Sequence, residues 1–579
     1  MSDLDESLKK LAEKGILRPE LRVGVVSFVK SYIAHINLRD AGNPSGTHFE
    51  GGRYGKGEVG EFVLIEGQRN ILLGRIIEVR LPEGERQNIG QDYAGSDDLD
   101  AIGHIQLLGS ISMTDFHVTA GVDAYPRLGD RVYVAPHQLI ALIPGLMTKT
   151  EDFNTPVQLE LGAVGTANGS NVNITPEKLF GRHCAILGAT GGGKSWTTAR
   201  IIEECIKHNS KIILLDATGE YRGFDGVEVM HCHLGEPVHK AERSIACSLP
   251  PTSFQESDFL ALFQPSGKVQ GPKLREAIRS LRLAMICPEL AENGLIIKAN
   301  KSKSVINQKL SDASIGKKVA DPNQEFDVTF LARQIEEECV WPTDNRDSKK
   351  WGNYDNSNAY CLSLITRINA VISSAAYECV FGESIDKAIT EVISEFLIEK
   401  DLGLLCICLS GIQQEFYAKE IITNTIGRYF LSRARSGAFK ENPTVVVVDE
   451  AHHFLGGLVG SEEMFSRLDA FELIAKEGRK FGLSICLATQ RPRDITEGVL
   501  SQMGTLVVHR LTNDRDRDVV ERACGEIDRS TSSFLPNLQP GEAAIIGVDF
   551  PFPLTIQINK PTFRPKSEGP NYQEHWKAE

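Results

Sequence analysis

The pattern of hydrophobic and polar positions changes near residue 150. Before that point, short runs alternate hydrophobic and β-branched residues with polar ones, as in 22–38, 60–67 and 70–81, and glycines and charged clusters separate the runs. Alternation with a period of two is typical of strands with one buried face. Residues 21–150 therefore predict an all-β unit, a small barrel. We expect a charged arm over 1–20 and a polar surface loop over 81–100.

After residue 150, short and almost continuously apolar runs alternate with helical stretches. This is the pattern of a parallel sheet whose two faces are covered by helices. The expected strands are 183–187, 211–216, 404–409, 444–449, 483–489 and 505–510. Between the expected strands 211–216 and 404–409, the strand pattern is weak over 251–399, which predicts a helical insertion. The α/β core is then formed by 151–250 and 400–560, and a polar tail covers 561–579.

The strongest motif matches G-x-x-x-x-G-K-[ST] and lies between an expected strand and an expected helix. Its residues are Gly188, Ala189, Thr190, Gly191, Gly192, Gly193, Lys194 and Ser195, and Trp196 follows in the helix. Glycines let the backbone wrap phosphates without Cβ clashes, and the amides at the helix start face the anion. We expect Lys194 to reach the β- and γ-phosphates of ATP and Ser195 to bind Mg²⁺. A chance glycine-rich turn is the alternative. The α/β region is thus predicted to be a RecA-like P-loop ATPase core.

A second motif is the acidic pair Asp449–Glu450 after four consecutive valines. The valines predict a buried central strand, and the acids then emerge at its carboxyl end, where open α/β sheets bind ligands. We expect Asp449 to hold Mg²⁺, largely through water, and Glu450 to orient and deprotonate the attacking water. The alternative is an acidic pair that caps a helix starting at Ala451. The letters DEAH also occur in some RNA helicases, but the second domain of those helicases and its arginine motif are not found.

Four further polar residues lie close to expected strand ends. Gln490 follows the strand 483–489 and is a candidate sensor of the γ-phosphate. Arg479, before that strand, is a candidate arginine finger for a neighbouring subunit, and a cation near a helix C-terminus is the alternative. Arg182 and Asp216 are expected near the nucleotide edge of the sheet. By composition alone, both also suit structural ion pairs.

Composition narrows the class of protein. The chain has 579 residues, of which 41% are hydrophobic, and a net charge of −14. The charge argues against a surface that binds nucleic acid everywhere, although it allows a local DNA site. No membrane span and no signal sequence are found, so we expect a cytoplasmic protein without membrane contact. The cysteines form no CxxC pair, and His231-Cys232-His233 is read as part of a strand or turn rather than as a metal site.

The motifs together resemble the HerA-type ATPases of the HerA/FtsK superfamily, over about residues 20–560. The resemblance is carried by FGRHCAILGATGGGKS, LLDATGEY, VVVVDEAH, EGRKFGLSICLATQRP and VLSQMGTLVVHRL, and by the β-rich front end, which is similar to the HAS-type barrel of that family. It implies a homohexameric ring with ATP sites between subunits and a central channel for double-stranded DNA. It also implies nucleotide-site roles for Arg182 and Arg479, a sensor role for Gln490, and a tail that packs on a neighbouring subunit.

The family further implies a partner enzyme, either a nuclease in DNA end processing or an effector such as a sirtuin-like NAD-consuming enzyme in antiphage defence. One hypothesis is therefore an ATP-driven translocase on duplex DNA, with channel loops such as Gly456–Arg467 touching phosphates. The second is an oligomeric scaffold that binds and activates an effector, with ATP as a switch and little translocation. A small-molecule kinase is disfavoured, because Glu450 stands where a water-activating base belongs.

Overall fold

The computed structural model describes residues 15–38, 47–49, 52–81, 101–114, 116–146, 157–164, 170–382, 387–455, 458–461, 464–524, 534–550, 552–566 and 576. These residues form two compact units. Unit 1 comprises Met1–His208, Ile485–Arg493 and Leu500–Arg564, and unit 2 comprises Asn209–Ser484, Asp494–Val499 and Pro565–Glu579. Most of the expected arm at 1–20, loop at 81–100 and tail at 561–579 lies outside the described residues.

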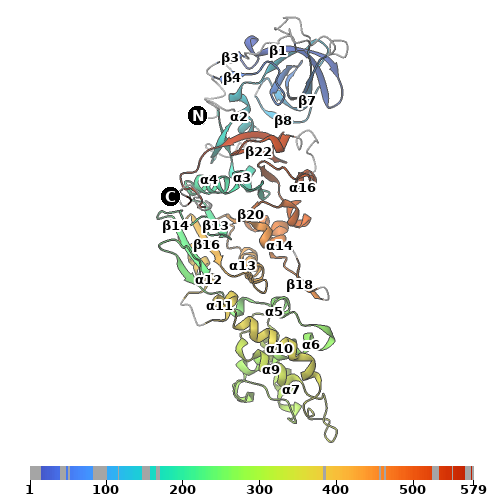
Figure 1. Cartoon of the computed structure of the whole chain (residues 1–579), viewed down its shortest axis with the longest axis vertical. Coiled ribbons are helices and arrows are strands. Elements are labelled where there is room, and N and C mark those ends of the chain that lie inside the picture. The colour runs from blue at the N-terminus through green and yellow to red at the C-terminus, as the bar shows by residue number, and fades with distance from the viewer. Residues whose placement is uncertain are drawn as a thin grey trace. The chain divides into compact units, whose positions relative to one another are not determined.

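Unit 1 begins with the expected barrel (Figure 1). Its strands follow one another in the order β2, β1, β9, β5, β6, β7, and β2 also pairs with β7, which closes the barrel. Their bounds are β1 Arg22–Val29, β2 Ile33–Leu38, β5 Phe62–Glu66, β6 Asn70–Arg80, β7 Ala101–Ser112 and β9 Arg131–Val134. β8 (Val118–Ala120) pairs antiparallel with β7, and β3 (Thr47–Phe49) pairs with β4 (Gly52–Tyr54). Alternate residues point inward and form one hydrophobic core, as the sequence pattern predicts.

The second sheet of unit 1 positions the glycine-rich motif. Its strands run in the order β11, β10, β23, β22, β21, β12, β20. Their bounds are β10 Leu159–Val164, β11 Ser170–Ile174, β12 Cys184–Leu187, β20 Leu483–Thr489, β21 Thr505–Val508, β22 Glu542–Gly547 and β23 Leu554–Ile558. β20 and β21 run parallel to β12, whereas β22 joins β21 antiparallel. The helices are α2 His137–Leu146, α3 Pro176–Phe180, α4 Lys194–Ile206 and α16 Asp514–Cys524.

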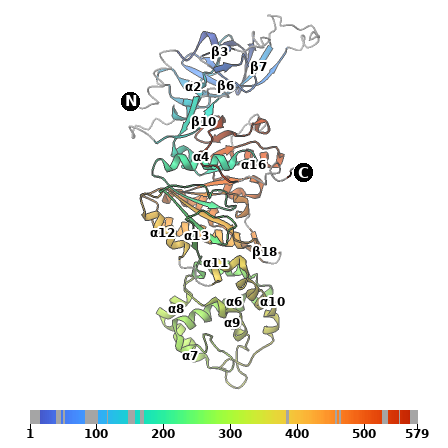
Figure 2. The same cartoon turned by 60° about the vertical axis from the view of Figure 1, so that its left-hand side comes forward.

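Unit 2 holds the remaining parallel strands, in the order β17, β13, β16, β14, β15. Their bounds are β13 Lys211–Asp216, β14 Val229–Gly235, β15 Ile245–Cys247, β16 Leu404–Gly411 and β17 Thr444–Val448. The helices beside them are α12 Ile389–Ile398, α13 Ala418–Arg435 and α14 Ala470–Glu477. α12 and α13 lie side by side (Figure 2), joined by the hydroxyls of Ser394 and Tyr429 at 2.9 Å. A hairpin follows β17, formed by β18 (Leu458–Ser461) and β19 (Met464–Arg467).

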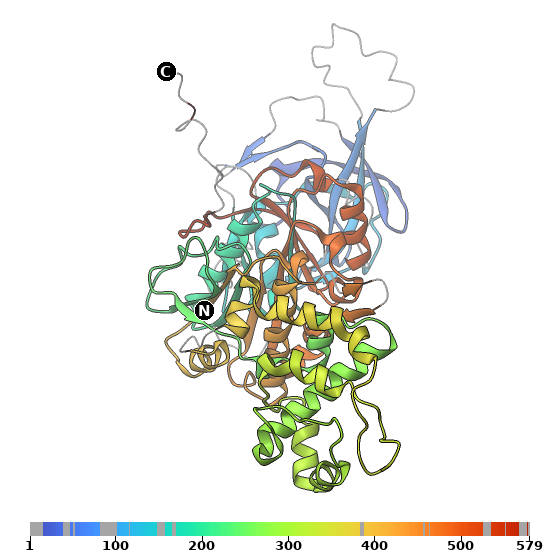
Figure 3. The ribbon, with the colours of Figure 1, turned by 60° about the horizontal axis from the view of Figure 1, so that its bottom comes forward.

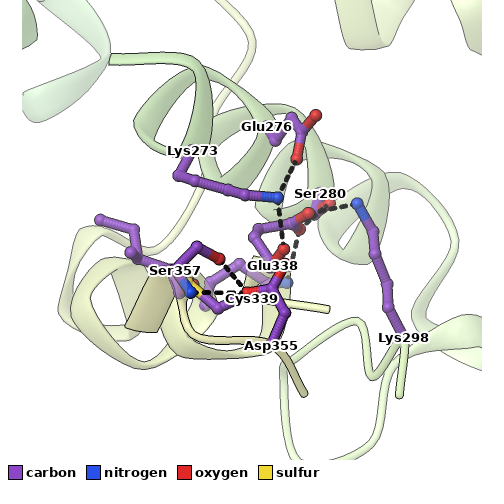
Figure 4. A network of polar contacts seen from close by, with 10 residues as sticks. Lys273, Glu276, Ser280, Lys298, Glu338, Cys339, Asp355 and Ser357 are labelled. Carbon is purple, nitrogen blue, oxygen red and sulfur yellow. Dashed lines mark hydrogen bonds and ion pairs between the residues drawn. The ribbon is translucent and has the colours of Figure 1, made fainter. Parts of the chain in front are cut away.

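The insertion between β15 and β16 is helical, as expected (Figure 3). Its helices are α5 Glu256–Phe263, α6 Gly267–Ile286, α7 Lys303–Ser311, α8 Ala313–Ala320, α9 Leu331–Glu338, α10 Ser357–Ile372 and α11 Glu378–Phe381. A buried polar network joins α6, α9 and the start of α10 around Glu338 (Figure 4). Within the described residues, no single helix is long and apolar enough to cross a membrane, although α10 and the bent segment 375–381 reach that threshold together.

Candidate active site

The glycine-rich segment forms the loop between β12 and α4. Gly191 and Gly193 have φ values of +74° and +112°, which glycine adopts without strain. At Gly193, an added Cβ would also lie 3.3 Å from Cα of Gly541 and from Cε1 of His509. Helix α4 starts directly at Lys194, so its first amides face the loop. Lys194 is buried, and its Nζ donates to the carbonyl of Ala189 at 3.2 Å. Trp196 is half-buried in the first turn.

His509 lies beside this loop and connects the first turn of α4 with β22. Its Nδ1 is 2.8 Å from the carbonyl of Glu542, and its Nε2 is 2.8 Å from the hydroxyl of Thr197. Because a carbonyl can only accept, Nδ1 carries the proton and Nε2 accepts from Thr197. Burial, with a smaller contribution from Lys194, lowers the pKa of His509 to about 4. A Cβ at Gly188 would lie 2.6 Å from Cβ of His509. The sequence analysis missed this residue, whose only signal is a polar side chain ending the apolar run 505–508.

Gln490 lies at the loop, as expected. β20 is parallel to β12, so the carboxyl ends of both strands are at the same edge. Gln490 follows β20, and the hydroxyl of Thr190 donates to its Oε1. An amide at this position can contact the phosphate end of a nucleotide held by the loop.

In unit 2, Asp449 and Asp216 lie at the carboxyl ends of neighbouring strands. β13 and β17 are parallel in register, and the N–H of Asp449 donates to the carbonyl of Leu215 at 3.1 Å. Asp216 therefore lies at the carboxyl end of β13 beside Asp449, and its place near a nucleotide stays a prediction. Its carboxylate accepts from the backbone N–H groups of Thr218, Gly219, Glu220 and Tyr221, and so shapes the loop after β13.

Both acids of the pair are buried. Asp449 is 4% exposed and Glu450 is 8% exposed. Burial raises the pKa of Asp449 well above its ordinary value, and the nearby carboxylates of Asp216, Glu450 and Glu220 raise it further. Such a carboxylate fits a bound cation, because a divalent ion would offset both burial and repulsion. Glu450 has a left-handed backbone, with φ +45° and ψ +46°, a strained conformation that clusters at functional sites. Its Oε2 is 3.2 Å from Nδ1 of His452.

Arg182 and Arg479 lie at the amino ends of strands, whereas the glycine-rich loop and Asp449 follow the carboxyl ends. The carbonyl of Arg182 accepts from the N–H of Gly504, just before β21 starts. The expectation that Arg182 lies near the nucleotide edge of its own chain is therefore wrong, because the whole of β12 separates it from the loop. Arg479 is exposed in the turn after α14, where the carbonyl of Gly482 pairs with Thr444 at the start of β17. Asp449 follows the other end of that strand.

The other sequence candidates have simple structural explanations or lie partly outside the described residues. His231 and His233 are in β14, where their ring nitrogens contact the carbonyl of Phe224 and the hydroxyl of Ser244. Cys232 lies between them and points to the other face of the strand. Within the described ranges, no cluster of three or more His, Cys, Asp or Glu side chains could hold a metal by itself. Of the loop Gly456–Arg467, residues 456–457 and 462–463 are not described.

Comparison with known proteins agrees with this arrangement of motifs. The model of the HerA helicase central domain matches residues 159–335. The DNA double-strand break repair helicase HerA of Sulfolobus acidocaldarius is 24% identical, over 90% of this chain and 92% of that protein. The probable DNA double-strand break repair helicase HerA of Methanocaldococcus jannaschii is also 24% identical, over 70% and 77%. The chain is similar to the HerA-type ATPases.

Two solved structures are similar at lower sequence identity. The bacterial conjugative coupling protein TrwBΔN70 covers 74% of this chain with a TM-score of 0.43, and VirB4 of Thermoanaerobacter pseudethanolicus covers 72% with a TM-score of 0.44. Each is 15% identical. Together with the glycine-rich loop and the acidic pair, the similarity to the HerA helicases makes this chain a P-loop ATPase with an N-terminal barrel and a helical insertion. Its reaction converts ATP and water to ADP and phosphate.

Proposed function

We propose that this HerA-type ATPase is a hexameric motor that moves double-stranded DNA and works with a partner nuclease or other effector enzyme. The observation that carries the proposal is the extent of similarity to a DNA double-strand break repair helicase, which spans 90% of this chain and 92% of that relative. The match includes the barrel as well as the ATPase core, so it reflects a shared whole-chain architecture rather than one P-loop. DNA end processing and antiphage defence are both roles that such a pair can serve.

The site residues divide into phosphate-binding and water-activating groups. The amides of the loop 188–195 and the ammonium of Lys194 bind the phosphates of ATP, and Gln490 contacts the γ-phosphate. Ser195 and Asp449 hold Mg²⁺, which neutralises charge on the phosphates. Glu450 orients the attacking water and accepts its proton. The raised pKa of Asp449 and the strained backbone of Glu450 support these roles.

Arg182 and Arg479 act on the nucleotide of a neighbouring subunit. Arg182 lies across β12 from its own P-loop, and Arg479 lies across β17 from its own Asp449, so neither is suited to its own site. An exposed arginine at a subunit boundary can instead stabilise charge on the transferred phosphoryl group, which is worth about 10³–10⁵ in rate. This requires an assembly in which ATP lies between subunits, as the proposed hexamer provides.

The assigned roles are tested by three substitutions. Lys194→Ala should abolish nucleotide binding or turnover. Glu450→Gln should keep ATP bound while hydrolysis stops, which binding of a fluorescent ATP analogue and phosphate release would measure together. Arg479→Ala should leave nucleotide binding nearly intact but lower kcat. Mixing Arg479→Ala chains with Glu450→Gln chains should restore part of the activity, because each supplies what the other lacks. Normal turnover by Arg479→Ala would refute the finger assignment.

An oligomeric scaffold that activates an effector is the second candidate, and the net charge of −14 favours it. The two functions differ in their response to DNA. A motor should hydrolyse ATP faster on duplexes, and the stimulation should rise with duplex length from about 20 to several hundred base pairs. A scaffold should show no stimulation while its effector remains active. A steady-state phosphate-release assay over a series of duplex lengths separates them.

A further inference from the structure

A polar pocket of about 700 Å³ lies in unit 2, lined by the loop after β13, the start of β14 and the loop between β14 and β15. None of the residues assigned to ATP binding or hydrolysis lines it. The volume is in the usual range for a small-molecule site and exceeds what one phosphate group needs. The pocket is therefore a candidate binding site in its own right.

The lining of this pocket is positively charged in an acidic protein. It carries four permanent cations and two histidines, against the two acids Asp225 and Glu242. The cations are Arg222, Lys240, Arg243 and Lys566, and the histidines are His231 and His239. In the part of the chain that the structure describes, none of the four cations has a carboxylate partner within ion-pair distance. The whole chain has a net charge of −14, so this pocket is a local excess of positive charge. An anion bound in the pocket would neutralise that charge.

Part of the lining is held in place by backbone contacts. The guanidinium of Arg222 donates to the carbonyl of Gly219 at 2.7 Å. The N–H of Lys566 donates to the carbonyl of Glu220 at 2.8 Å, which ties the C-terminal segment to the same loop. His231 contacts the carbonyl of Phe224 through Nε2 at 2.7 Å. Three of the cations thus come from residues 222–243 and the fourth is residue 566, and all four line one pocket.

The same loop reaches the acidic edge of the candidate active site. Asp216 accepts from the N–H groups of Gly219 at 2.7 Å and of Tyr221 at 3.1 Å. Asp216 is also one of the carboxylates that raise the pKa of Asp449. Arg222 directly follows Tyr221, so an anion that moved Arg222 would act on the loop that Asp216 shapes.

We propose that this pocket binds phosphate groups, as a second anion site distinct from the P-loop. Arginine pairs with phosphate through two parallel N–H bonds, and lysines add point charges around it. The phosphates come from a nucleic-acid backbone or from a small phosphate compound. The first source rests on the proposed function of the protein as a DNA motor, and the second does not.

The test reverses two exposed charges of the pocket in the full-length chain, Lys240→Glu with Arg243→Glu. The control is Lys317→Glu with Lys318→Glu, which makes the same change in net charge at two exposed lysines of α8 in the insertion. Binding to a 30-base-pair duplex without nucleotide is followed by fluorescence anisotropy at several salt concentrations. Binding of inorganic pyrophosphate is followed by calorimetry in the Lys194→Ala background, which removes the P-loop contribution.

If the pocket binds the DNA backbone, the pocket variant should bind the duplex at least about tenfold more weakly, and its salt slope should fall by about 2. The control should stay close to the native protein. If it binds a small phosphate compound, only pyrophosphate binding should be lost. Unchanged binding of both probes would overturn the proposal. A native protein that neither binds duplex nor responds to it would refute the DNA motor, while the pyrophosphate arm would still decide the pocket.

Discussion

Glu338 in the helical insertion and Asp449 at the end of β17 are both buried carboxylates of unit 2, and their surroundings are opposite. Glu338 is 1% exposed and forms an ion pair with Lys298, while its Oε1 accepts from Ser280 at 2.6 Å and from Gln334 at 3.0 Å (Figure 4). Asp449 has other acids as neighbours, and burial and those acids raise its pKa. A buried charge that is compensated inside the chain stabilises structure, whereas one that is not compensated suits a ligand.

The largest effect is expected when the compensation of Glu338 is removed. Lys298→Ala leaves a buried carboxylate without its cation and should lower the free energy of unfolding by about 3–5 kcal/mol. Chemical denaturation, followed by a signal from the insertion such as Trp351 under Lys298, would measure it; the ammonium lies 5.6 Å from that ring. ATP turnover per folded molecule should change little.

Lys301→Ala is the matched control for that change. Its ion pair with Glu292 joins side chains that are 53% and 60% exposed. A pair so exposed contributes about 0–1 kcal/mol, so the control should unfold almost like the native protein. If the two variants lose equal stability, burial is not what makes Lys298 important, and the comparison with Asp449 loses its basis.

The second effect is a loss of ATP turnover without a loss of stability. Asp449→Asn removes a negative charge that the folded chain holds among other acids, so the metal-free protein should be as stable as the native one or more so. Its ATP turnover should fall by about 10²–10³, the usual cost of losing one electrostatic contact in the transition state. Phosphate release and thermal unfolding in the same magnesium-free and magnesium-containing buffers would measure both. A variant that loses stability but keeps turnover would contradict the assigned role of Asp449.

The contrast between the two acids also explains what the sequence could predict. Asp449 and Glu450 are adjacent and follow four valines, so their place at a strand end is visible in a short window. The partners of Glu338 are far apart in the chain, and no local pattern connects Lys298 with it. The same limit applies to the barrel, whose strands follow from alternation, while its closure depends on β2 pairing with β7.

Within the α/β core, the expected strands at 183–187, 211–216, 404–409, 444–449, 483–489 and 505–510 are confirmed with small shifts at their ends. The strand β15 was not expected, and β14 was foreseen only in the reading of His231-Cys232-His233 as part of a strand or turn, because these histidines interrupt its apolar residues. Arg182 was misplaced because a residue that precedes a strand lies at the edge opposite to the loop that follows it.

The third effect concerns His509, the buried ionisable group beside the P-loop, which needs no opposite charge because it stays neutral. Its folded pKa of about 4 lies below the ordinary value of 6.5, so the unfolded chain binds the proton first as the pH falls. The stability that this residue provides is complete above pH 6.5 and is lost as the pH falls toward 4. From the two pKa values, about 2 kcal/mol should disappear between pH 7 and pH 5. Denaturation of native protein and His509→Gln at both pH values measures this share by difference, since glutamine can keep the bonds to Glu542 and Thr197 without titrating. Equal losses in the two proteins would mean that His509 accepts its proton in the folded state, with a second positive charge beside Lys194.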